Sequence, residues 1–444
     1  MPVCKGENSV GKRAMFLFIC LVVCLCAASP ALAQGKEEVR TEIYTREQLE
    51  AISSDPYGHY ALMADIDMGG KDWFPIPFHG VFEGGGHTLY NLSITQTGSG
   101  TAISVDGNRK EYETYYAALF SIAQGAAIKD LHLLGVDVDV STGENCFAAG
   151  LVGYAGGVEI TGCSVQGRVS LYMTNRMCGV AGIVGFGDGV VSRCRTDVTL
   201  ILVDGNDQIK CEEFLGAVIS CGYGDIEACT IKVLGYTSVH GYVHNGGVVG
   251  MYHIHTQQDR NRKGYIRDTD VDAVIHFFEH NTDRRAYCKA FIGERLRATV
   301  TQTGNTTTRF ESKEYRQYDK PLLPEQCQTP DYSAAVTEPT CTDFGYTTYA
   351  CKGCGYTYVA DFTGPRHTPG DWVVVEEPTY DAAGLRQRSC SVCGALLEEE
   401  ALDQLVKEPE PILVTACELE QYYVKVPYRG ALQLHVRVSP EDAD

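Results

Sequence analysis

Two short cysteine motifs are the residues whose types and spacing could do chemistry. They are Cys351-x-x-Cys354-Gly and Cys390-x-x-Cys393-Gly, placed 39 residues apart. A Cys-x-x-Cys turn aims two thiolates at one point, and two such turns can make a tetrahedral four-cysteine site for structural zinc. The sequence therefore predicts a structural metal site with four ligands, namely Cys351, Cys354, Cys390 and Cys393.

Other states of these thiols stay open. The 35 residues between the motifs exceed the roughly 15 to 20 that usually separate paired zinc motifs. A rival ligand set lies within the first module, and it consists of Cys341, Cys351, Cys354 and His367. Local disulfides are an alternative because export oxidises thiols, and free thiols are another. A thioredoxin-like role is disfavoured because no βαβ pattern surrounds either motif.

Four histidines are a second candidate for a metal site. They gather between residues 240 and 255, as His240, His244, His253 and His255. On irregular loops, a spacing of four does not turn side chains toward one another as it does on a helix. We therefore expect solvated loop histidines.

Patterns for catalysis are missing from the sequence. Glycoside hydrolysis would need paired carboxylates, and lyase chemistry would need acidic calcium ligands beside a basic residue. Neither set lies along the outward positions of the repeats described next. There is also no Ser-His-Asp, Cys-His or His-Glu-x-x-His motif. We therefore expect no enzyme activity, with a carbohydrate-active enzyme as the alternative.

Residues 117–277 contain one two-part sequence motif five times, with a period of about 32 residues. Its first half is a Gly-Leu-Val-Gly-like corner at residues 118–121, 150–153, 182–185, 216–219 and 247–250. Its second half places apolar residues in three columns: Ile128, Ile160, Val191, Ile226 and Ile266; Leu131, Cys163, Cys194, Cys229 and Thr269; Leu133, Val165, Thr196, Ile231 and Val271. Such a period is typical of a repeat architecture.

These repeats predict a parallel β-helix. Each copy has short strands and glycine-rich corners, without a helical period, and it cannot bury its apolar side alone. Copies stacked in parallel place each inward column in a ladder of like side chains. The cysteines of the second column are then expected to be small buried residues rather than disulfides. A sandwich of antiparallel hairpins is the alternative, but it would not demand columns in this register.

The Gly-Leu-Val-Gly corner followed by an I-x-x-C or I-x-x-L strand resembles the GLUG-type repeats of bacterial surface proteins, over roughly residues 41–277. This resemblance implies a right-handed parallel β-helix. In the resembling families an A-D-I-D strand and a G-x-F-x-G-x-G-H turn open the same solenoid, and residues 64–67 and 80–87 match them. One resembling group is the N-terminal region of large immunoglobulin-cleaving metallopeptidases.

The first coil of such a helix exposes an apolar end that must be covered. Thr45-Arg46-Glu47-Gln48 has the form of a capping box that opens a short helix, with Leu49 and Ile52 on one face. We expect this helix to be the N-terminal cap.

The N-terminus and the overall charge bear on localisation. Residues 1–33 have the pattern of an export signal: basic residues precede a 15-residue apolar run, and Ala31-Leu32-Ala33 is a small-x-small cleavage site. The run is shorter than the roughly 20 residues that span a bilayer. We expect cleavage after Ala33, a secreted or cell-surface protein and no transmembrane span. The net charge of −20 argues against nucleic acid as a partner.

The chain beyond the β-helix is modular. Residues 338–346 and 351–355 recur 39 positions later, and they resemble the tandem Cys-x-x-Cys-Gly modules of exported proteins of anaerobic Gram-positive bacteria. Two alternating stretches, 423–430 and 432–438, resemble the opening of a bacterial Ig-like sandwich. The predicted division is a signal peptide (1–33), a β-helix (34–310), a linker (311–336), two Cys-x-x-Cys-Gly repeats (337–405) and an incomplete Ig-like domain (406–444).

Taken together, the sequence predicts an all-β, exported and non-catalytic surface protein of adhesin or scaffold type. Loops inserted at 96–116 and 252–264 are expected to bind a host surface protein, a glycan or a cell-envelope component, because loops on a rigid scaffold commonly carry binding. The alternatives are a polysaccharide lyase or glycosidase, and the N-terminal part of a larger surface protease.

Overall fold

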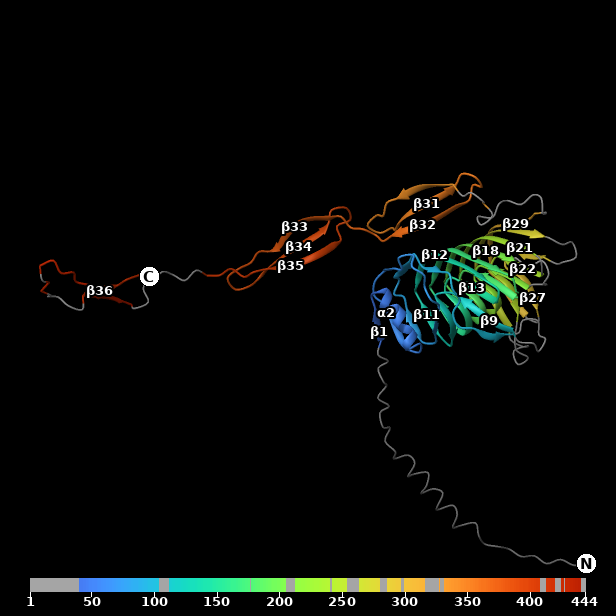
Figure 1. The fold of residues 1–444 in the computed structure, drawn as a ribbon, viewed down its shortest axis with the longest axis horizontal. Helices are drawn as coiled ribbons and strands as arrows, with labels where there is room; N and C mark the ends of the chain where they lie inside the picture. Colours follow the sequence, from blue (N-terminus) through green and yellow to red (C-terminus); the bar gives the residue numbers. More distant parts are fainter. Residues whose placement is uncertain are drawn as a thin grey trace, which may run out of the picture. The chain divides into compact units, whose positions relative to one another are not determined.

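The computed structural model describes residues 40–103, 112–175, 177–204, 212–239, 242–253, 263–279, 286–296, 299–315, 327, 331–407, 413–419, 425–426 and 428–440 (Figure 1). The predicted export signal and the centres of both predicted binding loops lie outside these residues. The chain divides into two compact units, one of Met1–Glu338 with Gly345–Gly364 and one of Pro339–Phe344 with Pro365–Asp444.

Most of the first unit is a parallel β-helix, as predicted, and its coils follow one another from α2 to β29 in Figure 1. Three sheets run along it. The first sheet contains β1 (Arg40–Ile43), β2 (His59–Leu62), β4 (Ile76–Phe78), β5 (Val81–Glu83), β10 (Phe120–Gln124), β11 (Ala127–Lys129), β14 (Val152–Thr161), β17 (Val184–Ser192), β20 (Ile219–Glu227), β23 (Val249–His253), β24 (Lys263–Arg267), β27 (Ile292–Leu296) and β28 (Thr299–Thr303).

The second and third sheets complete each coil. The second contains β3 (Ile66–Asp67), β6 (Thr88–Tyr90), β7 (Ser93–Ile94), β12 (His132–Thr142), β15 (Ser164–Met173), β18 (Arg195–Asp204), β21 (Thr230–Val239), β25 (Asp270–Glu279) and β29 (Thr306–Tyr315). The third contains β8 (Thr101–Ile103), β9 (Tyr112–Ala117), β13 (Asn145–Ala149), β16 (Met177–Ala181), β19 (Glu212–Gly216), β22 (Tyr242–Gly246) and β26 (Ala286–Lys289).

The predicted columns are confirmed as ladders. Ile160 is in register with Ile128 on one side and Val191 on the other, and the ladder continues through Ile226 to Ile266. All five side chains are buried in one core. Each contributes roughly 1.5 to 3 kcal/mol through removal of apolar surface from water.

The cysteine column lies at the corner that follows this ladder. Cys163, Cys194 and Cys229 are buried, and none of them forms a disulfide. Their thiols face backbone carbonyls, with the Sγ of Cys194 donating to the carbonyl of Ser192 at 3.2 Å. Cysteine therefore acts here as a small core residue that can also satisfy a carbonyl.

The first coil is covered by the predicted cap. Helix α2 (Arg46–Glu50) starts with a capping box in which the Thr45 hydroxyl accepts from the Gln48 backbone N–H. The short 3-10 helix η1 (Ala51–Ser54) follows directly. Leu49 and Ile52 are fully buried in the same core as the ladders, so the cap covers the apolar end of the solenoid.

Two small antiparallel sheets carry the Cys-x-x-Cys-Gly motifs. The first hairpin module, within the first unit, consists of β30 (Tyr332–Thr337), β31 (Gly345–Cys351) and β32 (Thr357–Thr363). The second hairpin module, within the second unit, consists of β33 (Pro369–Glu376), β34 (Gly384–Cys390) and β35 (Leu396–Leu402). Strands β34 and β35 lie 39 positions after β31 and β32, which is the period seen in the sequence.

The expected boundaries do not coincide with the ends of strands. The predicted linker 311–336 overlaps β29, which runs to Tyr315, and β30, which begins at Tyr332. The sequence analysis missed both strands because neither has the regular alternation of apolar and polar residues that marks a half-buried strand. This pattern fits their positions, since β29 is the last strand of its sheet and most of β30 is exposed. Near the C-terminus, β36 (Ala416–Leu419) pairs with β37 (Val436–Ser439), whereas the expected strand over 432–438 starts only at Val436.

The ladder makes a direct prediction about stability. Replacing Ile160 by Asp should remove roughly 2 to 5 kcal/mol of apolar packing and leave a buried carboxylate without a partner. We expect loss of the cooperative β-helix transition in thermal melts followed by circular dichroism. Glu159→Asp is the matched control, since Glu159 is the exposed neighbour on the same strand. A wild-type melting profile for Ile160→Asp would contradict the ladder.

Candidate metal centres

A four-residue cluster in the second unit has the composition of a metal site. It consists of Cys341, His367, Cys390 and Cys393, and one ligand atom from each lies within 4.8 Å of all the others. Cys390 ends β34 and Cys393 lies in the turn that follows, while Cys341 and His367 come from irregular segments. We call this group the cysteine–histidine cluster.

The Cys-x-x-Cys turn is held by its own backbone. The N–H of Gly394 donates to the carbonyl of Cys390 at 2.9 Å, and the N–H of Cys390 donates to the carbonyl of Ala395 at 2.8 Å. Gly394 has a φ of +77°, a left-handed conformation that costs other residues steric strain. The glycine after the second cysteine is therefore required to close the turn that brings both thiols into one cluster.

Backbone hydrogen bonds bring the other two ligands to this turn. The turn that contains Cys341 is closed by Thr340, whose hydroxyl accepts from the N–H of Asp343 at 2.9 Å. The N–H of Arg366 donates to the carbonyl of Thr340 at 2.9 Å, and the N–H of Ser391 donates to the carbonyl of Thr368 at 2.8 Å. His367 is thus fixed between a bond to the Cys341 turn and a bond to the Cys390 turn.

The distances in the cluster fit zinc better than a disulfide. The Sγ atoms of Cys341 and Cys390 are 3.6 Å apart, and the Sγ of Cys393 is 3.4 Å from Nδ1 of His367. Zinc–sulfur bonds of about 2.3 Å at a tetrahedral angle put two sulfurs about 3.8 Å apart. A disulfide needs about 2.05 Å. Three thiolates and one imidazole would complete a closed structural zinc site.

A second cluster lies in the first unit. Cys327, Cys351 and Cys354 bring their sulfur atoms within 4.8 Å of one another, and the Sγ atoms of Cys327 and Cys351 are 3.6 Å apart. The turn repeats the geometry of the other motif, with Gly355 at a φ of +75°. Within the described residues this three-cysteine cluster offers three ligands, one fewer than a structural zinc usually takes.

Each cluster contains one thiol that ionises easily. The backbone N–H of Cys393 is the main cause that lowers the pKa of Cys390 to about 5. The backbone N–H of Cys354 likewise lowers the pKa of Cys351 to about 7. Burial is the main cause that raises the pKa of Cys341 to about 11. A bound cation would favour the thiolate form of this third ligand, since metals bind thiolates.

The structure distributes the predicted ligands differently from the sequence analysis. Each Cys-x-x-Cys pair is completed by residues of its own unit, so the four predicted cysteines belong to two clusters. The rival set is divided as well, because Cys341 and His367 lie with the second motif. Cys327 was missed, although it precedes Cys351 by 24 positions much as His367 precedes Cys390 by 23. That near-equal spacing is the sequence signal for both ligands.

The expectation of solvated histidines is wrong for the two that the structure describes. His244 and His253 lie in β22 and β23, with exposed fractions of 4% and 1%. The ring of His244 stacks between Phe214 and Tyr287, and its Nδ1 is 2.8 Å from a carboxylate oxygen of Glu294. These positions belong to strands rather than loops, which explains their burial. His240 and His255 lie outside the described residues.

The cysteine–histidine cluster predicts a metal stoichiometry. Cys341→Ser and His367→Ala should each remove about one equivalent of zinc, because a fourth ligand is lost from a closed site. Elemental analysis of the purified full chain, together with a free-thiol titration, measures this. Cys417→Ser is the control, since Cys417 is exposed and belongs to neither cluster. Equal metal content in Cys341→Ser and wild type would contradict the assignment.

Comparisons with known proteins add little to this geometry. No family model matches the chain, and no curated protein matches it. A solved structure titled "IgA1 Protease" is 14% identical, with a TM-score of 0.38, and the match covers 64% of this chain and 22% of that one. The chain therefore spans about a fifth of that structure's length. The resemblances to GLUG-type repeats and to an Ig-like domain stay predictions.

Proposed function

We propose that this chain is an exported, non-catalytic surface scaffold, in which the β-helix is the binding body and metal-clamped hairpin modules follow it along the chain. Its partners are a host surface protein, a glycan or a component of the cell envelope. Export would follow cleavage of the signal after Ala33. Among the described residues, no helix is long and apolar enough to cross a membrane.

The cysteine–histidine cluster is the observation that supports this proposal most strongly. Its ligands come from the turn between β30 and β31, from the connection before β33, and from the turn after β34. A metal bound there would tie these three segments of the second unit to one another. Structural zinc sites are closed by four protein ligands, whereas catalytic sites keep one position open for water or substrate. Four protein ligands therefore favour a mechanical role.

The second hairpin module has little else to stabilise it. All residues of this module, 369–402, are described, and Cys390 is the only buried hydrophobic residue among them. Val373, Val374 and Leu396 are exposed. Small domains without a sufficient core commonly depend on a metal or on disulfides. A metal at the cysteine–histidine cluster would supply this stabilisation, since metal binding to folded ligands is also folding free energy.

Chelation tests the clamp. Treating the full chain with a strong zinc chelator should expose the connection around His367 to limited proteolysis, while the β-helix remains resistant. Cys341→Ala should show the same cleavage without chelator. Tyr380→Ala is the matched control, because Tyr380 occupies the corresponding place in the second module, 39 positions later, and is exposed.

Two outcomes would contradict the proposal, one for the metal clamp and one for the non-catalytic role. Cleavage that is unchanged by chelation and by Cys341→Ala would remove the metal clamp from the proposal. Turnover of any member of a polysaccharide panel by the wild-type chain would replace the non-catalytic role with a carbohydrate-active one.

A further inference from the structure

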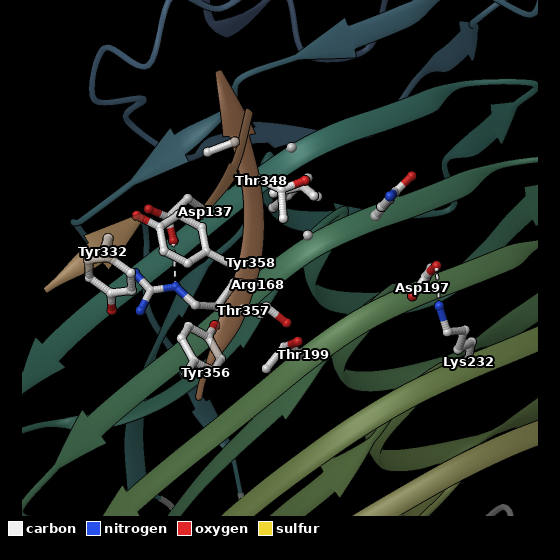
Figure 2. A pocket seen from close by; sticks show the side chains of 16 residues that line it. Asp137, Arg168, Asp197, Thr199, Lys232, Tyr332, Thr348, Tyr356, Thr357 and Tyr358 are labelled. Atoms are coloured by element: carbon white, nitrogen blue, oxygen red, sulfur yellow. Dashed lines mark hydrogen bonds and ion pairs between the residues drawn. The ribbon is translucent and has the colours of Figure 1, made fainter. Parts of the chain in front are cut away.

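A cleft of about 560 Å³ lies within the first unit, where the first hairpin module meets the β-helix. Its floor comes from the outward face of β12, β15, β18 and β21, and its wall comes from β30, β31 and β32 (Figure 2). The volume falls in the range of roughly 300 to 1,000 Å³ that is common for small-molecule sites. The described residues of the two predicted binding loops are not part of its lining.

The hairpin is seated by a bulge in β12. The register between β12 and β15 shifts between Leu134 and Val136, so Gly135 is an extra residue. A Cβ atom at Gly135 would lie 2.4 Å from the ring of Phe362, which is itself 4% exposed. Asn91 then binds the Phe362 backbone twice, accepting from its N–H at 3.0 Å and donating to its carbonyl at 2.9 Å. These contacts fix the wall of the cleft.

Paired charges make the floor polar and neutral. Arg168 donates from Nε to Asp137 at 2.9 Å and from Nη2 to Asp139 at 3.1 Å. On the next two coils, Lys232 of β21 donates to Asp197 of β18 at 3.0 Å. The lining thus holds two acidic and two basic side chains, with each base paired to an acid.

Tyrosines form the wall. The rings of Tyr332 and Tyr358 meet edge to face at 5.4 Å, and those of Tyr356 and Tyr358 stack at 5.9 Å. All three are only partly buried. Figure 2 shows the three rings gathered around the Arg168 side chain, with the Asp197–Lys232 pair farther along the cleft. Thr199 and Thr357 lie between these two groups and add hydroxyls.

This combination matches the chemistry of a sugar ring. A pyranose offers a face of C–H groups that packs on an aromatic ring, and a rim of hydroxyls that bonds to fixed polar side chains. Aromatic rings supply large contact area together with a polar handle, and orienting polar groups supply specificity. A polyanion is disfavoured, because the basic side chains are already paired and the whole chain carries a net charge of −20.

We propose that this cleft binds a neutral oligosaccharide, with one sugar ring against Tyr356 and Tyr358 and its hydroxyls bonded to the Asp137–Arg168 and Asp197–Lys232 pairs. This assignment rests on the proposed function as a binding scaffold, and it names the ligand class and its place.

Calorimetry on the full chain tests the proposal. The probes are cellohexaose, xylohexaose, mannohexaose and chitohexaose, with polygalacturonate and heparin as anionic counterparts. We expect one-to-one binding of at least one neutral hexaose. Tyr356→Leu should weaken it about tenfold or more, which corresponds to the loss of an aromatic contact. Tyr380→Leu is the control, since Tyr380 lies in the second module outside the cleft.

A second variant separates loss of the site from loss of folding. Thr199→Trp places a large side chain on the outward face of β18 and should abolish binding with an unchanged β-helix melting transition. The proposal is overturned if no neutral hexaose binds, if both cleft variants bind like wild type, or if an anionic polymer is the preferred ligand. Binding with turnover would refute the non-catalytic role but support the proposed ligand class. A negative result in the chelation test of the metal clamp would not affect the proposal for the cleft.

Discussion

The structure depends on the in-register stacking of parallel coils. Backbone hydrogen bonds between coils align each inward column, and burial of residues such as Ile160 makes a one-residue slip costly, because a slip would turn the apolar set outward. The same register fixes the outward rows. Asp137, Arg168 and Thr199 stand in one row, and Gln166, Asp197 and Lys232 stand in another. The register of the buried core therefore also arranges the outward polar side chains of the β-helix in rows.

One local departure from this regularity creates the cleft. The bulge at Gly135 interrupts the ladder between β12 and β15 and opens space for the Phe362 ring. Bulges re-aim side chains and commonly lie next to functional sites. The hairpin seated there brings three tyrosines around the Asp137–Arg168 pair. A regular solenoid surface would lack such a wall, so the cleft lies where the repeat is broken.

Most of the β-helix could be predicted from the sequence, because its signal is local and repeated. The Ile128 column and the Cys163 column recur at a nearly constant period, and period alone predicts their stacking. The ligand clusters could be predicted only in part. The Cys-x-x-Cys turns are visible in sequence, but Cys327 and His367 differ in residue type and lie one position apart within the 39-residue repeat. Which thiols converge is decided by how the turns pack.

The cleft was invisible in the sequence for a related reason. The residues of its floor lie at least 100 positions before those of its wall, and none of its tyrosines belongs to a motif. The two parts are brought together by the packing of Phe362 on Gly135 and by its backbone bonds to Asn91. A glycine in a strand predicts a bulge but does not identify the residue that fills it. The candidate metal clusters and the cleft therefore have different physical origins in this chain. The cysteine clusters depend on short turns that can be recognised locally in the sequence, whereas the cleft depends on contacts between segments far apart in the chain.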